Sequence, residues 1–331
     1  MTQAANTFGE DLVEATFTFH EAPLETAPQA LAPLRRSDDA ADDFSELRRR
    51  MHQDGYLFLP GHLDRQGVLA ARHTVTQRLA DTGLLAPDRP TIDCIAAANT
   101  QTGFMAELAQ DNPELDRVLY AGPMMDFYHG FLDGPVRPFD YTWFRAKSPG
   151  GNGTQPHYDV VYMGRGTRRL YTSWTPLGDI TLDMGGLMIL EGSHQQQELI
   201  ATYGQQDVDR YCENDPASQQ LVEQARSQDR NLTGQERGQV QWQSPTFGSY
   251  SADAVSTRQK LGGRWLTAPY QMGDLLVFSM YTMHASPDNH TDQIRLSSDS
   301  RYQLASEPVD ERWIGADPPG HGIRAHRGMI C

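Results

Sequence analysis

The stretch Thr154-Gln155-Pro156-His157-Tyr158-Asp159 follows a glycine-rich turn and places an imidazole two positions before a carboxylate. Two residues is the period of a β-strand, so the side chains of His157 and Asp159 would project from one face. One imidazole nitrogen and one carboxylate oxygen are part of a divalent metal site. A second histidine from elsewhere would complete a 2-His-1-carboxylate triad with open coordination positions. The pair alone also fits a surface turn with a hydrogen-bonded histidine, so the rest of the chain has to decide.

Short β-rich runs separated by Gly and Pro surround this pair and begin after Gly134. Residues 141–147 are predicted to form a strand. Its side chains would alternate between two faces, one with Trp143, Arg145 and Lys147 and the other with Phe144 and Ala146. Further strands are predicted at residues 170–175, 187–190, 270–278 and 294–304. Such a pattern is typical of a sandwich or barrel, so the fold class is predicted to be mainly β with flanking helices.

The remaining chain adds an arm, helices and an insertion. Residues 1–40 are rich in Ala, Pro, Asp and Glu with little periodicity, which predicts an extended or poorly ordered N-terminal arm. Apolar spacing predicts helices over residues 44–51, 64–79 and 112–132, and a short buried strand at 56–60. The polar, Gln-rich segment from about 195 to 264 is interpreted as a partly helical insertion, either a lid or surface decoration. Residues 41–331 are expected to form a single domain around that insertion.

Composition limits the classes of partner. The formal net charge is −15 over 331 residues, which repels phosphate backbones and anionic lipid surfaces, so neither nucleic acid nor membrane is an expected partner. Cys94, Cys212 and Cys331 are far apart and include no Cys-x-x-Cys pair. No signal-peptide pattern or apolar stretch of ~18 residues is present, so a cytoplasmic protein is expected. A small-molecule substrate is the expected partner, and nothing in the sequence indicates an oligomeric state.

His284 is the histidine that best completes the site. It follows a near-continuous apolar strand, precedes Ala285-Ser286-Pro287, and lies far beyond Asp159 in the chain. Such a separation is typical of a double-sheet jelly roll, whose two ligand-bearing strands are neighbours in space but belong to different Greek keys. Farther on, Arg295 and Ser297 share one strand face, where a guanidinium beside a hydroxyl suits a bidentate carboxylate. A structural ion pair is the alternative for Arg295.

Together these residues resemble the phytanoyl-CoA dioxygenase family of Fe(II)- and 2-oxoglutarate-dependent oxygenases. Five segments carry the resemblance in order: 54–61, 157–159, 185–194, 273–284 and 295–297. The similarity spans about residues 44 to 304 and leaves out the arm, the insertion and the C-terminal tail. It implies a double-stranded β-helix core of the jelly-roll, cupin-like type.

The resemblance also implies roles for individual residues. The catalytic Fe(II) ligands would be His157, Asp159 and His284. The distal carboxylate of 2-oxoglutarate would be held by Arg295 and Ser297, and two further positions look like parts of the cosubstrate pocket, Thr172 and Trp174. His194 is not carried over as a ligand, because its Gly-Ser-His segment resembles a structural turn.

The implied activity is a dioxygenase reaction that uses O2 and 2-oxoglutarate, releases succinate and CO2, and hydroxylates an unactivated C–H bond of a small-molecule metabolite. Asp159 favours hydroxylation, because related halogenases replace this carboxylate with a small residue that admits chloride; desaturation and ring chemistry stay open as other outcomes. Arg145 and Lys147 are expected either to bind an anionic substrate or to be solvated or paired charges. Two alternatives stay open: a cupin-like metalloenzyme that does not use 2-oxoglutarate, and a catalytically silent jelly-roll binding protein.

Overall fold

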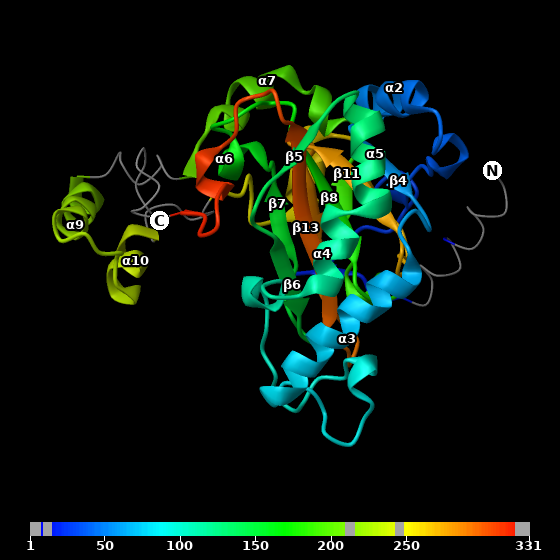
Figure 1. The fold of residues 1–331 in the computed structure, drawn as a ribbon, viewed down its shortest axis with the longest axis horizontal. Helices are drawn as coiled ribbons and strands as arrows, with labels where there is room; N and C mark the ends of the chain where they lie inside the picture. The colour runs from blue at the N-terminus through cyan, green and yellow to red at the C-terminus, as the bar shows by residue number, and fades with distance from the viewer. Residues whose placement is uncertain (1–7, 9–14, 209–215, 242–247, 322–331) are drawn as a thin grey trace.

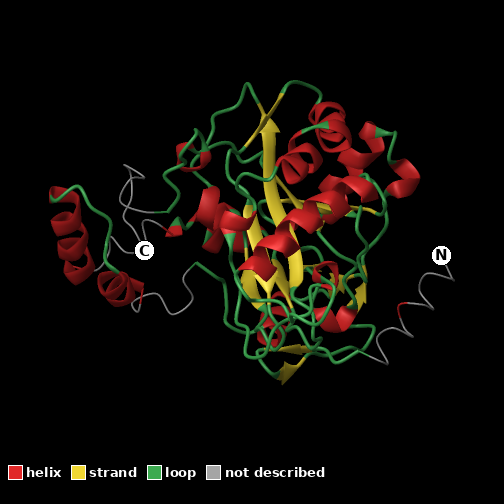
Figure 2. Ribbon diagram, turned by 60° about the horizontal axis from the view of Figure 1, so that its bottom comes forward, coloured by secondary structure: helices red, strands yellow, loops and turns green. Residues whose placement is uncertain are grey.

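Two β-sheets lie at the centre of the molecule (Figures 1 and 2). The computed structural model describes residue 8 and residues 15–208, 216–241 and 248–321. The larger sheet has the strand order β4 (Tyr56–Leu59), β11 (Leu275–Ser279), β8 (Tyr171–Pro176), β13 (Arg295–Leu304), β5 (Val136–Pro138), with β6 (Trp143–Lys147) also paired to β13. The smaller sheet has the order β3 (Leu31–Pro33), β10 (Trp265–Thr267), β9 (Met188–Leu190), β12 (His284–Ser286), β7 (Thr154–His157).

The two sheets pack face to face across an apolar cluster. Ile189 and Leu266 of the smaller sheet meet Trp174 and Leu276 of the larger one in this cluster. All four side chains are buried, and burial of apolar area is the main favourable contribution to folding. The predicted mainly β fold is confirmed.

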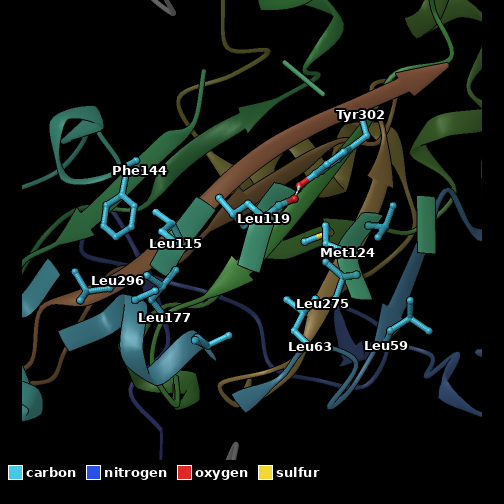
Figure 3. Packing of buried hydrophobic residues seen from close by; sticks show 14 of the residues in the cluster. Leu59, Leu63, Leu115, Leu119, Met124, Phe144, Leu177, Leu275, Leu296 and Tyr302 are labelled. Atoms are coloured by element: carbon cyan, nitrogen blue, oxygen red, sulfur yellow. Dashed lines mark hydrogen bonds between the residues drawn. The ribbon is translucent and has the colours of Figure 1, made fainter. Parts of the chain in front are cut away.

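Side chains alternate between the two faces of the larger sheet. On its outer face, Leu296 and Tyr302 of β13 and Phe144 of β6 belong to one apolar cluster beneath the helices (Figure 3). The Tyr302 hydroxyl also donates a hydrogen bond to the Leu119 carbonyl (2.5 Å). Trp143 belongs to a separate cluster, so the predicted alternation within residues 141–147 is confirmed.

Four helices cover that outer face (Figure 1): α2 (Phe44–Asp54), α3 (Arg65–Asp81), α4 (Pro113–Tyr120) and α5 (Gly122–Leu132). The prediction of one helix over residues 112–132 is wrong. The chain is extended at Ala121 (φ −147°, ψ 177°), and Gly122 has a positive φ of 50°. Pro123 follows and has no backbone N–H for a helical hydrogen bond, so the first helix cannot continue and a new helix begins at Gly122. Apolar spacing missed the break because both helices contribute to the same cluster.

The N-terminal arm packs against the smaller sheet. β1 (Thr18–Phe19) and β2 (Ala22–Pro23) form a short hairpin, and β3 joins the sheet parallel to β10. The Asp288 carboxylate accepts hydrogen bonds from the Thr18 hydroxyl (2.6 Å) and from the backbone N–H of His20 (2.9 Å). Of the extended or poorly ordered arm predicted from composition, residues 15–40 thus make specific long-range contacts, which composition cannot show. Its first part, residues 1–7 and 9–14, lies outside the described residues.

Helices also occupy the segment predicted as an insertion: α7 (Gln197–Ala201), α9 (Pro216–Ser227), α10 (Gly234–Gln241) and α11 (Ala254–Leu261). Figures 1 and 2 both show α9 and α10 apart from the sheets. The end of the insertion returns to them, because the Tyr250 N–H donates to the Pro156 carbonyl of β7 (2.8 Å). Among the helices of the described ranges, none has the length and apolar character needed to span a membrane.

Candidate active site

His157, Asp159 and His284 lie together although they come from distant parts of the chain. His157 ends β7, His284 begins β12, and the two residues are direct partners across the strands. Asp159 lies just beyond the strand, at the start of α6 (Val160–Met163), with helical dihedrals (φ −62°, ψ −29°). One ligand atom from each residue lies within 4.8 Å of the other two. The structure thus brings the three predicted residues together, but Asp159 reaches the site through a turn after β7 and not through the strand period.

The second ring nitrogen of each histidine is already hydrogen bonded. The Nδ1–H of His157 donates to the Gln155 carbonyl (2.8 Å), and the Nδ1–H of His284 donates to the Thr282 carbonyl (3.0 Å). These bonds select the tautomer in which each Nε2 keeps its lone pair, and both Nε2 atoms lie 3.8 Å from Oδ1 of Asp159. Burial and the neighbouring His284 lower the pKa of His157 to about 3, and burial lowers the pKa of His284. Both imidazoles are thus neutral, as metal ligands must be.

The carboxylate of Asp159 divides its two oxygens between two environments. Oδ2 accepts hydrogen bonds from the Thr172 hydroxyl and from Nη2 of Arg301 (3.1 Å), while Oδ1 faces the two histidines. Thr172 and Arg301 are cross-strand partners on β8 and β13. Burial raises the pKa of Asp159, but Arg301, the imidazoles and the Thr172 hydroxyl outweigh burial and bring it below its ordinary value. Two neutral imidazoles and one ionised carboxylate form the donor set of a 2-His-1-carboxylate site for a divalent ion such as Fe(II).

Arg295 is buried without an anionic partner in the described part of the chain. It is 1% exposed, its Nη1 donates to the Gly185 carbonyl (3.1 Å), and its Nε has no hydrogen-bond partner. Ser297 Oγ and Trp174 Nε1 are also buried without a partner, and the Arg295 guanidinium carbon lies 5.9 Å from the Trp174 ring centroid. Burial, and then the charge of Arg145, lower the pKa of Arg295 to about 10, so it remains charged at neutral pH. An unpaired buried charge costs free energy that an incoming carboxylate would offset.

A cavity of about 260 Å³ opens beside the triad. Its lining includes His157, Asp159, Arg145 and Tyr162. Ser249, at the returning end of the insertion, also lines the cavity and hydrogen bonds to Tyr162. This end of the insertion therefore forms part of the cavity wall. A larger cavity of about 950 Å³, between α4 and the C-terminal segment, contains none of the three triad residues.

The two basic residues expected either to bind a substrate or to be solvated or paired charges differ in position. Arg145 lines the cavity, and its Nε donates to Oδ2 of Asp299 (3.3 Å). Lys147 is buried and does not line it, since its Nζ donates to Ser286 Oγ (2.8 Å) and to a neighbouring backbone carbonyl. The position of Lys147 thus gives no support to a role in substrate binding, whereas that of Arg145 does.

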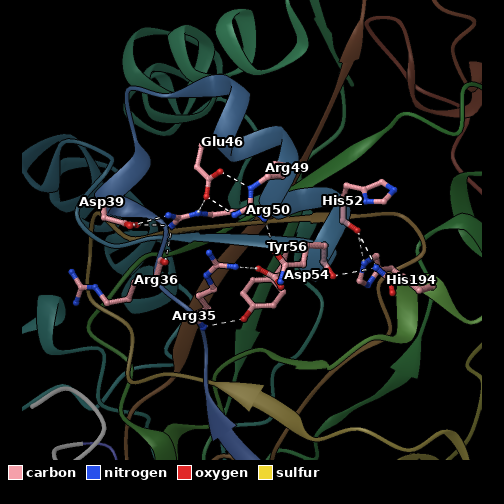
Figure 4. A network of polar contacts seen from close by, with 12 residues as sticks. Arg35, Arg36, Asp39, Glu46, Arg49, Arg50, His52, Asp54, Tyr56 and His194 are labelled. Carbon is pink, nitrogen blue, oxygen red and sulfur yellow. Dashed lines mark hydrogen bonds and ion pairs between the residues drawn. The ribbon is translucent and has the colours of Figure 1, made fainter. Parts of the chain in front are cut away.

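His194 belongs to a structural turn, as the resemblance implies. Its Nε2–H donates to the His52 carbonyl (3.1 Å) in the polar network of Figure 4. Gly55 has a φ of 78°, and a Cβ there would lie 2.5 Å from the His194 ring. The two sequence segments that contain these residues, 54–61 and 185–194, therefore meet in the fold and require glycine at position 55.

Arg301 is a residue of this site that the sequence analysis missed. It holds Asp159, and its guanidinium carbon lies 4.0 Å from the ring centroid of Trp143. The strand period of two places Arg295 and Arg301 on the same face of β13. This spacing could have identified Arg301 from the sequence. Thr172, expected in the cosubstrate pocket, donates a hydrogen bond to the carboxylate of Asp159.

The chain is similar to known proteins in both sequence and structure. Residues 51–297 match the sequence profile of the family described as phytanoyl-CoA dioxygenase (PhyH). The 1-deoxypentalenic acid 11-beta-hydroxylase of Streptomyces exfoliatus is 25% identical to this chain over 279 residues, which are 80% of this chain and 83% of that protein.

Two solved structures from nogalamycin biosynthesis share the fold. The non-heme alpha ketoglutarate dependent carbocyclase SnoK has a TM-score of 0.53 at 16% identity, covering 81% of this chain and 87% of that one. The epimerase SnoN, in complex with Fe3+, alpha ketoglutarate and nogalamycin RO, has a TM-score of 0.52 at 19% identity, covering 84% and 93%. These likenesses confirm the predicted double-stranded β-helix core.

Proposed function

Because the chain belongs to the phytanoyl-CoA dioxygenase family of Fe(II)- and 2-oxoglutarate-dependent oxygenases, we propose that His157, Asp159 and His284 hold Fe(II) and that Arg295 receives the distal carboxylate of 2-oxoglutarate. The donor set of the triad fits that metal. The observation that carries the cosubstrate assignment is the buried, charged Arg295 without an anionic partner in the described residues, next to the unpaired Ser297 hydroxyl. When bound, Fe(II), 2-oxoglutarate and O2 supply an oxidation in which a substrate C–H becomes C–OH, with release of succinate and CO2.

The protein contributes orientation and exclusion of water. Thr172 and Arg301 bind one oxygen of Asp159 and leave the other directed at the two histidines. Trp174 closes the cosubstrate side, since its ring is fully buried beside Arg295. Trp143 and Tyr162 line the substrate side. Fixed donors in a site closed to water act more strongly than the same groups in solution.

The substrate is proposed to be a small molecule, because a cavity of about 260 Å³ suits a compact metabolite. A CoA thioester would be too large to enter it whole. A cytoplasmic location is also proposed: Cys94 is a buried free thiol, as expected in a reducing compartment, while Cys212 and Cys331 lie outside the described residues.

Thr172→Val is expected to weaken Fe(II) binding about 10-fold, because losing a residue that hydrogen bonds to a metal ligand typically costs roughly 10- to 100-fold in affinity. Valine has nearly the same shape but cannot donate to Asp159. The measurement is an anaerobic Fe(II) titration by calorimetry. Thr76→Val, at an equally buried threonine on α3, is the matched control and should bind iron as the wild type does. Equal affinities for both variants would remove this positioning role from Thr172.

The test of the whole proposal is a screen of candidate metabolites scored by substrate-dependent succinate release. We expect succinate to form in proportion to hydroxylated product, and only when Fe(II), O2 and 2-oxoglutarate are all present. Product formed without 2-oxoglutarate would support the cupin-like metalloenzyme instead. Failure of the purified protein to bind Fe(II) and 2-oxoglutarate would support the silent binding protein.

A further inference from the structure

Arg145 lines the cavity, and its guanidinium group is only partly hydrogen bonded. It lies on β6 opposite Ser297 of β13, and its side chain is 30% exposed. Its Nε donates to Asp299, but neither terminal nitrogen makes a hydrogen bond within the described ranges. Because the same cavity is lined by His157 and Asp159, a group bound to Arg145 would lie beside the metal site.

The other two guanidinium groups of the site are already engaged or enclosed. Arg301 also lines the cavity, but it is 3% exposed, donates to Asp159 and stacks on Trp143. Arg295 does not line this cavity and is assigned to 2-oxoglutarate. Among these three, Arg145 is therefore the one most exposed to a substrate in the cavity.

The charges around the site leave one positive charge unmatched. Three guanidinium groups and two carboxylates face it: Arg145, Arg295, Arg301, Asp159 and Asp299. Bound Fe(II) and 2-oxoglutarate carry opposite charges of equal size and leave this balance unchanged. Lys147 is left out of this count, because it does not line the cavity and its Nζ is hydrogen bonded to uncharged groups. An excess of one positive charge within a chain of net charge −15 favours a monoanion in the remaining space.

The wall next to Arg145 is apolar. Phe104 is 51% exposed, the one large hydrophobic side chain so exposed among the described residues, and it lines the same cavity. Its backbone pairs with Arg145, whose guanidinium carbon lies 5.9 Å from the Phe104 ring centroid. Trp143 and Met163 line the cavity as well. A ligand that contacts this wall buries apolar surface while its charged end meets Arg145.

We propose that the substrate is a compact apolar molecule with a single carboxylate, which Arg145 binds while the apolar skeleton packs against Phe104 and Trp143. This inference rests on the proposed function and names the substrate class for that site. Arg145 is then a specificity-determining residue that holds the carboxylate end. A planar guanidinium with two free terminal nitrogens matches the two oxygens of a carboxylate.

The test uses anaerobic protein loaded with Fe(II) and N-oxalylglycine, an unreactive analogue of 2-oxoglutarate that occupies the cosubstrate pocket. The probes are adamantane-1-carboxylate and adamantane-1-carboxamide, which have nearly the same shape and differ in charge. Calorimetry should show that the wild type binds the carboxylate about 10-fold or more tightly than the carboxamide, as expected for hydrogen bonds to a charged group. Equal binding of both probes, or binding of neither, would overturn the proposal.

Arg145→Gln is expected to bring the carboxylate-to-carboxamide affinity ratio to about 1, and Arg145→Lys to restore part of it. A merely structural role would weaken both probes alike and leave the ratio unchanged, which would also overturn the proposal. Arg145→Gln/Asp299→Asn removes the carboxylate that the single variant leaves without its partner, and should also give a lower ratio than the wild type. Arg169→Gln is the matched control, since Arg169 is 61% exposed and pairs with Glu307.

The loading step separates this inference from the proposed function. If the wild type does not bind N-oxalylglycine, the proposed function fails before any probe is added. If Arg145→Gln loses affinity for N-oxalylglycine and keeps the probe ratio, Arg145 serves the cosubstrate and the substrate inference is wrong. Normal loading combined with a lost ratio supports both.

Discussion

His284→Ala is expected to remove measurable Fe(II) binding and, with it, all substrate-dependent succinate release. The variant keeps two of three ligands, so its loss of affinity should exceed the roughly 10- to 100-fold that follows removal of a residue hydrogen bonded to a ligand. His284 is the choice because it tests the pairing of β12 with β7, which brings the two histidines together. The measurements are an anaerobic Fe(II) titration and a succinate assay on the same preparation.

The matched control is His73→Ala, at an exposed histidine on α3, which should bind iron and turn over normally. His284 is 5% exposed, so alanine leaves a small void, and urea unfolding of the metal-free protein will show whether the fold survives. His284→Gln fills more of this void and should also lose iron. Wild-type Fe(II) affinity in both folded variants would show that the metal is held elsewhere.

Local sequence patterns were enough to predict much of the fold. The alternation along β6 and β13 could be read from the sequence because the outer face is apolar, as at Phe144 and Leu296, and the inner face is polar, as at Arg295 and Ser297. When one face of a strand is buried against helices, a shift of one residue would expose the whole apolar set, so the pattern fixes the register.

Other features depend on contacts between distant residues and could not be predicted. The arm becomes ordered because Asp288 binds the backbone at His20, which composition cannot show. Asp159 joins the histidines through the turn into α6. The strand period therefore predicted that His157 and Asp159 lie together, but not the backbone conformation that brings them together. The role of Arg301 required knowing that β13 lies beside β8, since its cross-strand partner Thr172 binds the same carboxylate oxygen.

Arg295→Met is expected to weaken 2-oxoglutarate binding about 100-fold or more while Fe(II) affinity stays unchanged. Two charge-assisted hydrogen bonds to a carboxylate contribute about 1.5–3 kcal/mol each, and methionine can form neither. The measurement is calorimetric titration of 2-oxoglutarate into anaerobic, Fe(II)-loaded protein. Arg65→Met is the matched control, because Arg65 is 47% exposed and pairs with Asp179 on the surface.

The stability of the metal-free Arg295→Met protein decides between the cosubstrate role and the structural ion pair that the sequence left as an alternative. Removing one partner of a buried ion pair typically costs about 3–5 kcal/mol, because the other charge is left unpaired. No described carboxylate pairs with Arg295, so an apolar side chain of similar length should leave the free energy of unfolding unchanged or raise it. A variant that loses 2-oxoglutarate but not stability has lost a binding group. A large loss of stability would instead assign Arg295 to the fold.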